Sequence, residues 1–390
     1  MKVVVTAHDL ALGGTQTYAL TVAEQLQRLG HDAILHAAEG GAAGRLAEER
    51  GLTVAETEAD LPGDPDVVLA QDSMMSYRMA DRFPETPQLF RCPNAIFDLQ
   101  MPPQLPGIVG ALVVLSERFA RRLRALAVTQ DIVRMRQPVD TDLFAERSAI
   151  RDRPRRALLI GNYLHGQRRR MLIDAWESAG VECSVAGGQA SITATPETAM
   201  ADADIVVAKG KAALEAMACG RAVYVYDQYG CDGWVSPDTY PAFEADNFAG
   251  LATDRPAGPR LLLADLEGYR PEMGPQNRDL VVRHHGARAH AESLVAVMRQ
   301  LAPRAPQPGA PYRELARLVR LGWETERRAH QRGVENTALH ERLLETEALL
   351  AGSEAALGSA ERRYLDLVAS RRYRAGAQLG RLADTMRGRT

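Results

Sequence analysis

Short apolar runs alternate with amphipathic segments along the first 300 residues. The first run covers residues 3–5 and precedes a stripe of apolar positions at helical spacing, namely Ala19, Val22, Ala23, Leu26 and Leu29. Gly30 ends this segment, and further runs follow at 33–35, 67–69, 111–115 and 132–133. Short continuous runs between helices are typical of buried parallel strands. The pattern therefore predicts a doubly wound α/β domain over residues 1–147.

A second α/β series follows a polar stretch at 148–156 that contains Pro154 and predicts a linker. Its apolar runs are residues 157–160, 183–186, 205–207 and 222–226. The proline-rich stretch 303–311 ends the series, so we expect a second domain over residues 157–302. Two Rossmann-like domains that face each other would bind a ligand between the carboxyl ends of their strands.

The remaining segment, residues 312–390, is rich in Arg, Glu, Ala and Leu and predicts a helical extension. One row of apolar residues recurs every seven positions: Leu343, Leu350, Leu357 and Tyr364. A weaker companion row consists of Leu339, Thr346, Ser353, Ala360 and Leu367. This heptad pattern fits a coiled coil that makes a homo-oligomer, or a helix that packs on the protein's own domains.

The last stretch of the chain is basic. It contains Arg371, Arg372, Arg374, Arg381, Arg387 and Arg389. Two interpretations stay open: a solvated tail, or a peripheral contact with an anionic membrane surface.

Composition narrows the range of partners. The 390 residues carry a net charge of −3 and only 5% aromatic residues, so we expect no nucleic-acid partner.

The four cysteines (Cys92, Cys183, Cys219 and Cys231) form no CxxC pair, so we expect neither a disulfide framework nor a zinc site. The first residues read as a strand and not as a signal peptide, and no stretch approaches 18 apolar residues. We expect a cytoplasmic protein.

Three loops carry candidate chemistry. Gly13 and Gly14 lie between the first strand and its helix, where glycine lets backbone N–H groups approach an anionic ligand. Gly161 ends the first strand of the second series, and Arg168 in the next helix can clamp a diphosphate or simply face solvent. The third loop is Lys209-Gly210-Lys211.

Glu215 lies one turn into the helix that follows this third loop. Its neighbours Ala212, Ala213, Leu214, Ala216 and Met217 are apolar, so we expect its carboxylate to have a partner. A carboxylate can accept two hydroxyl hydrogen bonds, as a ribose offers.

Five segments in this order resemble the retaining family-4 glycosyltransferases. They are GGTQTYALTVAEQLQRLGHDA (13–33), VVLSERFARRL (113–123), VDTDLF (139–144), IGN (160–162) and LEAMACGRAV (214–223). The resemblance spans about residues 1–300. It implies a GT-B fold and transfer of a sugar, with retention of configuration, from a nucleotide-diphosphate sugar to a glycan, lipid-linked or small-molecule acceptor. It implies no metal and no further cofactor.

The resemblance also assigns residues. Glu215 matches the second glutamate of the family's E-x7-E motif, which holds the ribose, and Gly210 matches a glycine that lies against the donor sugar. Gly13 and Gly14 match the glycine loop near the donor phosphates. The chain departs from the pattern at Val207, which takes the place of the first glutamate, and at Asn162, which takes the place of an arginine. His8 is the nearest substitute for a first-domain histidine.

These departures leave two functions open. In the first, the protein is a variant enzyme in which Lys209 is the catalytic cation and Lys211 and Arg168 also neutralise the leaving group. In the second, it is a non-catalytic GT-B scaffold that binds a sugar or nucleotide and recruits a partner through its C-terminal helix.

Overall fold

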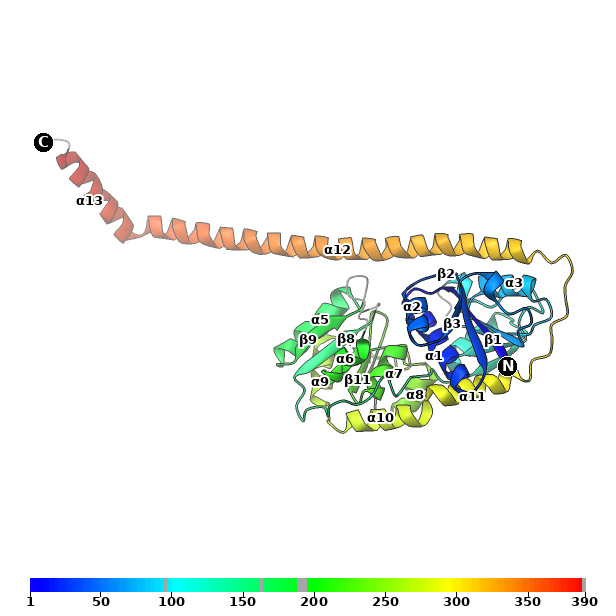
Figure 1. Cartoon of the computed structure of the whole chain (residues 1–390). Helices are drawn as coiled ribbons and strands as arrows, with labels where there is room; N and C mark the ends of the chain where they lie inside the picture. Colours follow the sequence, from blue (N-terminus) through cyan, green and yellow to red (C-terminus); the bar gives the residue numbers. More distant parts are fainter. Residues whose placement is uncertain (94–96, 162–163, 188–194, 388–390) are drawn as a thin grey trace. The chain divides into compact units, whose positions relative to one another are not determined.

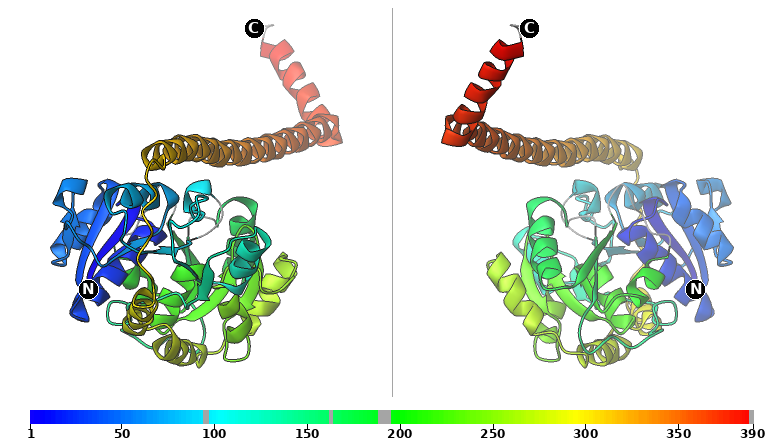
Figure 2. Two further views of the ribbon diagram at one scale, coloured as in Figure 1. Left: turned by 90° about the vertical axis from the view of Figure 1, so that its right-hand side faces the viewer. Right: turned by 90° about the vertical axis from the view of Figure 1, so that its left-hand side faces the viewer.

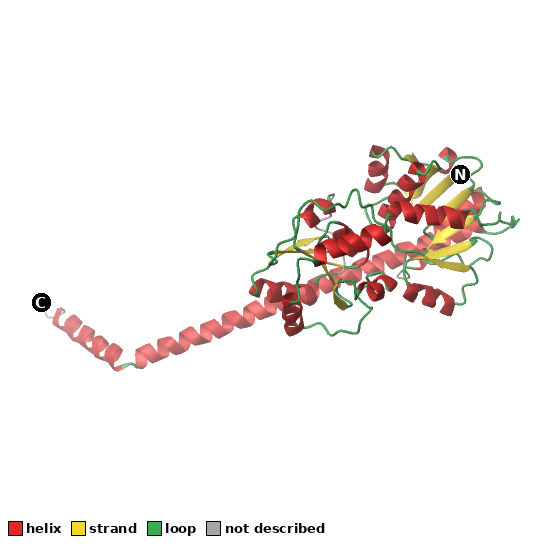
Figure 3. Cartoon of the chain, turned by 90° about the horizontal axis from the view of Figure 1, so that it is seen from below, coloured by secondary structure: helices red, strands yellow, loops and turns green. Residues whose placement is uncertain are grey.

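The chain forms two compact units, Met1–Arg328 and Ala329–Thr390. The computed structural model describes residues 1–93, 97–161, 164–187 and 195–387. The first unit contains two α/β lobes, each built on its own sheet (Figures 1 and 3), as the alternating sequence pattern predicts.

The first lobe is a seven-stranded parallel sheet with the strand order β3-β2-β1-β4-β5-β6-β7. The strands are β1 (Lys2–Asp9), β2 (Asp32–Glu39), β3 (Thr53–Ala55), β4 (Val67–Ala70), β5 (Gln88–Arg91), β6 (Ala111–Val114) and β7 (Asp131–Arg134). The main helices of this lobe are α1 (Gly14–Arg28), α2 (Ala42–Glu49), α3 (Ser73–Arg82) and α4 (Glu117–Ala125). The chain order reverses between β1 and β4, which is the position where doubly wound sheets bind ligands.

Each predicted apolar run of the first lobe lies in a strand. Val4 pairs in parallel register with Ile34 on one side and with Val68 on the other. The sequence pattern did not predict β3 and β5. Strand β5 is fully buried but contains the polar residues Gln88 and Arg91. Its sequence therefore shows no continuous apolar run, and the strand could not be recognised from the pattern.

The second lobe is a five-stranded sheet with the order β12-β11-β10-β8-β9. Its strands are β8 (Arg156–Ile160), β9 (Glu182–Ala186), β10 (Ile205–Ala208), β11 (Ala222–Tyr226) and the antiparallel β12 (Cys231–Trp234). Its helices are α5 (Gly166–Ser178), α6 (Pro196–Ala201), α7 (Gly210–Ala218), α8 (Tyr240–Ala245), α9 (Pro259–Glu267) and α10 (Met273–His284). Figure 2 shows these elements in green beside the blue first lobe.

The chain then returns to the first lobe. Helix α11 (Ala287–Met298) buries Leu294 in the same apolar cluster as Leu26 of α1. His290 of this helix lies 2.8 Å from the hydroxyl of Tyr18. The first turns of α12 (Tyr312–Ala369) bury Tyr312 and Ala316 on the opposite side of the first sheet. The predicted domain limits stay predictions. Helix α11 and the start of α12 pack against the first sheet and therefore belong to the first lobe.

The second unit consists of the rest of α12 and of α13 (Arg371–Arg387). The helical extension predicted from residue 312 is therefore present, with a break at Ser370. Arg389 of the basic tail lies outside the described residues, as does Asn162 of the second lobe. No helix in the described ranges is long and apolar enough to cross a membrane.

Candidate functional site

The glycine loop of the first lobe leads directly into α1. Gly13 is the N-cap of this helix, and its carbonyl accepts bonds from the backbone N–H and the hydroxyl of Thr17, both at 2.9 Å. A Cβ on Gly13 would come within 2.7 Å of Oε1 of the buried Gln16, whereas a Cβ on Gly14 would meet no atom within 4 Å. The backbone of Gly13 is extended, so its conformation does not require glycine there. The two glycines keep the space at the helix start open, as expected where a ligand approaches.

Lys211 of the second lobe joins this loop to Glu215. Its ammonium nitrogen lies 3.1 Å from the hydroxyl oxygen of Thr17 and 2.8 Å from Oε1 of Glu215. Glu215 is 8% exposed, so the predicted partner of this carboxylate in an apolar helix face is Lys211. The structure thus brings Gly13 close to Lys211 and Glu215, although about 200 residues of sequence lie between the glycine loop and helix α7.

Lys209 and Gly210 begin helix α7 at the carboxyl end of β10. The Lys209 ammonium group forms an ion pair with the carboxylate of Asp227, which follows β11 and is 2% exposed. It also lies 5.2 Å from the centre of the Tyr229 ring. Gly210 adopts a φ of +56°, which favours glycine, and its N–H donates to the carbonyl of Phe248 at 2.7 Å. The first N–H group of this helix is therefore already bonded within the protein.

Arg168 lies in the first turn of α5 and contacts the same carboxyl end of the sheet. Its Nη1 atom donates to the carbonyl of Asp227 at 3.4 Å, and the Tyr226 hydroxyl donates to the Arg168 carbonyl at 3.0 Å. Gly161 ends β8 with a φ of +148°, and its N–H donates to Ala186 at 3.2 Å. The candidate donor site is therefore a continuous edge formed by the ends of β8, β10 and β11.

The two lysines of this edge are paired with carboxylates in the structure. Lys211 faces Glu215, and Lys209 faces Asp227. Sequence reasoning missed Asp227 and Thr17, whose roles depend on contacts between distant segments. The place of Asp227 directly after an apolar run was the signal that could have identified it.

A second polar cluster lies at the carboxyl edge of the first sheet. The imidazole Nε2 of His8 is 3.1 Å from the carboxylate of Asp9, which accepts a 2.6 Å bond from Gln16. Burial alone would lower the His8 pKa, but the bond to Asp9 and the nearby charges of Asp72 and Glu39 raise it above its usual value. His8 thus lies close to the glycine loop, with a pKa raised by its acidic neighbours.

Asp72 is buried at the end of β4 and caps α3 through a 2.8 Å bond from the N–H of Met75. Burial raises the pKa of its carboxyl to about 6, although the charge of His8 opposes the shift. Its Oδ2 atom has no hydrogen-bond partner among the described residues. A buried carboxyl oxygen without a partner costs free energy, which makes this atom a candidate contact for a ligand hydroxyl.

Arg91 is a buried cation at the end of β5. Its guanidinium carbon lies 4.2 Å from the centre of the Tyr18 ring, and Nη1 donates to Gln71 at 3.4 Å. Its Nε atom has no partner in the part of the chain that the structure describes, and burial lowers the pKa of the group. The first lobe therefore offers both a cation and a carboxyl group with unused hydrogen-bonding capacity.

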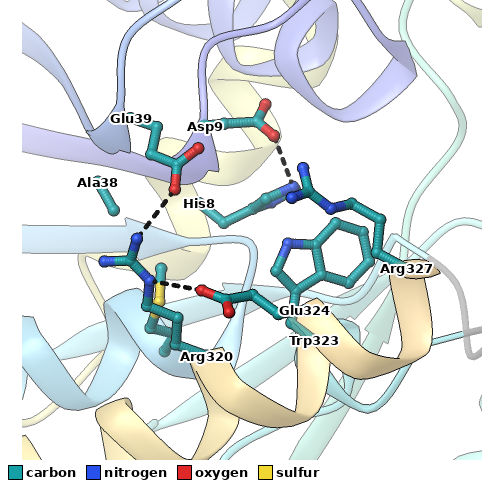
Figure 4. A pocket seen from close by; sticks show the side chains of 9 residues that line it. His8, Asp9, Ala38, Glu39, Arg320, Trp323, Glu324 and Arg327 are labelled. Carbon is teal, nitrogen blue, oxygen red and sulfur yellow. Dashed lines mark hydrogen bonds and ion pairs between the residues drawn. The ribbon is translucent and has the colours of Figure 1, made fainter.

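The start of α12 covers this edge (Figure 4). Trp323 makes edge-to-face contacts with the rings of His8 and Phe97, at centroid distances of 5.1 and 4.8 Å. Arg320 forms a 3.2 Å ion pair with Glu39. A cavity of about 20 Å³ remains between α12 and the sheet, which is about the space of one water molecule. Trp323 was not predicted, because it lies 315 residues from the histidine that it contacts.

The expected absence of a metal or further cofactor stays a prediction. Among the described residues, no group of three or more His, Cys, Asp and Glu side chains could hold a metal ion.

Comparisons with known proteins identify the fold. No family model matches the chain, and no curated protein matches its sequence. Solved structures do match. A glycosyltransferase from Rickettsia africae is 13% identical with a TM-score of 0.54, covering 77% of this chain and 98% of its own. Anabaena HepE in complex with UDP and glucose is 11% identical with a TM-score of 0.53, covering 77% of this chain and 100% of its own.

A third match has the same TM-score of 0.53. It is an alpha-glucosyltransferase in complex with UDP and a 13-mer DNA, 11% identical, covering 77% of this chain and 100% of its own. At these identities the likeness concerns the fold. The chain has the two-lobed GT-B fold of glycosyltransferases, with a long C-terminal helix added to it.

Proposed function

We propose that this protein transfers a sugar from a nucleotide-diphosphate sugar to an acceptor hydroxyl. The observation that carries the proposal is the contact of Lys211 with both Thr17 and Glu215, which joins the open glycine loop of one lobe to the donor edge of the other. GT-B neighbours bind such ligands: HepE was solved with UDP and with UDP-glucose. A uridine diphosphate sugar is therefore the first donor to test.

In this proposal the lysines of the second lobe release their carboxylate partners and bind the donor instead. The ribose hydroxyls donate to Glu215, and the diphosphate takes the place of Asp227 and Glu215 as counter-ion for the lysines. Gly161 and Gly210 leave the backbone close to the donor, and Arg168 lies at the same edge. Lys209 stabilises the charge that develops on the leaving diphosphate, which makes it the catalytic cation.

We propose transfer with retention of configuration. The bond from the anomeric carbon to the diphosphate oxygen breaks, and a bond to the acceptor oxygen forms on the same face. The acceptor proton passes to the leaving diphosphate, so the protein mainly positions the two substrates. The acceptor hydroxyls are placed at the first-lobe edge, where His8, Asp72 and Arg91 offer hydrogen-bonding groups and Trp323 forms the wall. The acceptor is a glycan, a lipid-linked sugar or a small molecule.

A non-catalytic scaffold is the second candidate function. The observation in its favour is Val207, which takes the place of a family carboxylate and is fully buried in the core of β10. In this case the site binds a nucleotide or sugar without turnover, and the C-terminal helix recruits the working partner.

The test combines calorimetry with donor turnover. Binding of UDP, GDP and TDP is measured first, and hydrolysis of the corresponding nucleotide sugars is measured with and without a panel of saccharide acceptors. Binding with turnover supports the enzyme, and binding without turnover for every donor supports the scaffold. Failure to bind any of the three nucleotides would contradict both functions.

We also propose a cytoplasmic location, with the basic tail in peripheral contact with the inner face of the membrane. Arg371, Arg372, Arg374 and Arg381 lie exposed on α13. Each arginine near an anionic surface adds about 1 kcal/mol of salt-sensitive attraction. Flotation with vesicles containing phosphatidylglycerol, at low and high salt, tests the contact against a chain that ends at Ser370.

A further inference from the structure

The second unit exposes a row of large apolar side chains. Leu343, Leu350 and Leu357 are 54%, 59% and 63% exposed, and Tyr364 continues the row at 64%. We call these four residues, together with Leu339, Thr346, Ser353, Ala360 and Leu367, the heptad seam. Leu339 and Leu367 at its two ends are 60% and 57% exposed. Large apolar groups in one row at this exposure indicate a surface that another chain covers.

Three glycines weaken the helix itself. Gly333, Gly352 and Gly358 lie inside it, and each weakens a helix by roughly 1 kcal/mol relative to alanine. A Cβ at any of these three positions would meet no atom within 4 Å, so none is needed for close packing in the chain. Most helical stability in proteins comes from packing an apolar face. This helix therefore needs a partner along the seam.

The repeat itself identifies the partner as another helix of the same repeat. A strict seven-residue period keeps an apolar row facing a second helix that winds around the first. In heptad terms, Leu343, Leu350, Leu357 and Tyr364 take the a positions, and the companion row takes the d positions. Thr346 fits this row because its hydroxyl already donates to the carbonyl of Arg342 at 2.8 Å. A second copy of the chain supplies the matching row.

Charges beside the seam bear on the orientation of the two copies. The e positions are Glu347, Glu354 and Glu361, and the g positions are Arg342, Leu349, Ala356 and Arg363. In a parallel pair each g position faces an e position five residues later in the other chain, so Arg342 meets Glu347 of the second copy. In an antiparallel pair e faces e, which would place glutamates against one another. The charge pattern therefore favours the parallel pair.

Asn336 adds an independent signal. It takes the a position one heptad before Leu343. A single buried asparagine at an a position pairs with its copy across a parallel dimer and fixes both register and the number of strands, at a cost in stability. One heptad before Leu343, it would align the two chains ahead of the leucine row.

We propose that residues 329–369 form a parallel, two-stranded coiled coil with the same segment of a second copy of this chain, with Asn336 opposite Asn336. In a parallel pair, both copies of the first unit connect to the same end of the coil through residue 328, and both basic α13 helices follow its other end. The 41 residues span roughly 60 Å at 1.5 Å per residue. The dimer thus offers two candidate transfer sites to one acceptor, and the arginines of two α13 helices to an anionic surface.

Mass measurement tests the pairing in the full-length chain. Light scattering across micromolar concentrations should give a dimer for the parent. Leu350→Glu should weaken dimerisation by roughly two orders of magnitude, because it places a charge in the buried seam. Leu344→Glu is the matched control, since Leu344 is also exposed, at 47%, but lies off the seam. A monomeric parent, or equal effects of the two substitutions, would overturn the proposal. Neither outcome depends on whether the protein transfers sugars.

Cross-linking tests the orientation. Asn336→Cys should form a disulfide-linked dimer on oxidation, whereas Leu344→Cys should not. In an antiparallel pair centred on the seam, the two copies of residue 336 would lie about 45 Å apart and could not be linked. Of the native cysteines, Cys92, Cys219 and Cys231 are buried, and the parent chain is the control for Cys183. A dimer that Asn336→Cys does not link would refute the parallel arrangement.

Discussion

The carboxyl edges of the two sheets differ in how their charged groups are paired. At the second-lobe edge both lysines are already paired, Lys209 with Asp227 and Lys211 with Glu215, although the nearby Gln228 Oε1 has no partner among the described residues. At the first-lobe edge the charged groups themselves keep unpaired atoms in the part of the chain that the structure describes. They are Asp72 Oδ2 and Arg91 Nε.

This difference indicates how each edge meets a ligand. A paired edge can bind a diphosphate only by exchanging one anion for another, so ligand affinity there is a difference between two strong interactions. An edge with unpaired groups gains directly when ligand hydroxyls satisfy them. We therefore expect the second lobe to select its ligand by the charge of the diphosphate. We expect the first lobe to select its ligand by the positions of the ligand hydroxyls. Four substitutions test this contrast, ordered by the size of the expected effect.

Removing the Lys209 side chain should give the largest effect. Lys209→Ala should reduce turnover roughly 100-fold, because one preorganised group that stabilises developing charge contributes about this much. It also leaves Asp227 buried without its counter-charge, which lowers the melting temperature. The double variant Lys209→Ala/Asp227→Asn removes that charge and should recover stability without recovering turnover. Recovery of turnover in the double variant would mean that Lys209 only neutralises Asp227.

Asp72→Asn should change how stability depends on pH. The folded-state pKa of Asp72 is raised to about 6 from 3.8, so the folded protein holds this proton more tightly than the unfolded chain. The resulting stability is present at low pH and is lost as the pH rises through about 6. At 1.36 kcal/mol per pKa unit, the total loss is about 3 kcal/mol, of which about 2 kcal/mol falls between pH 4 and 6.

Asparagine keeps the cap of α3 but cannot ionise. Urea unfolding of parent and variant at pH 4 to 8 should therefore show a difference that develops between pH 4 and 6. Histidines buried elsewhere, such as His285, titrate in both proteins and cancel. A constant difference across this range would show that Asp72 is not a strained carboxyl.

Glu215→Ala should weaken UDP binding by roughly 10- to 150-fold. The loss of a charged hydrogen-bond acceptor costs ~1.5–3 kcal/mol, and each 1.4 kcal/mol is a factor of ten. Calorimetry measures the effect, and Glu215→Gln is the control because it keeps an oxygen acceptor and removes the charge. If Glu215→Ala binds UDP as tightly as the parent, the ribose role is wrong and the scaffold function gains support.

Thr17→Val should give the smallest effect. It removes the hydroxyl that Lys211 reaches across the two lobes, and a hydrogen bond to a charged group contributes about 1.5 kcal/mol, or roughly tenfold in UDP affinity at most. Thr21→Val is matched in chemistry and helix, because its hydroxyl donates to the carbonyl of Thr17 within α1. Equal affinities of the two variants would show that the bridge does not support nucleotide binding.

The sequence alone predicted most of the fold, because most strands and the C-terminal helix have a recognisable local pattern of apolar residues. Continuous apolar runs gave nine of the strands, among them β1 and β10, and the seven-residue period gave the extension. Strands β3, β5 and β12 were missed because they are short or contain polar residues such as Gln88, and their strand geometry comes from pairing with neighbours. Pairing is a property of the sheet and not of the segment.

For the candidate site, the sequence by itself determined the residue types and their order: Gly13, Lys209, Gly210 and Glu215 in βα loops of an α/β chain. Only the tertiary structure decided their partners. Asp227 neutralises Lys209, Thr17 meets Lys211 across the two lobes, and Trp323 covers His8 from 315 residues away. A local pattern shows which face of an element is apolar. A contact between distant segments, by contrast, exists only after both sheets have formed and the chain has returned to the first lobe.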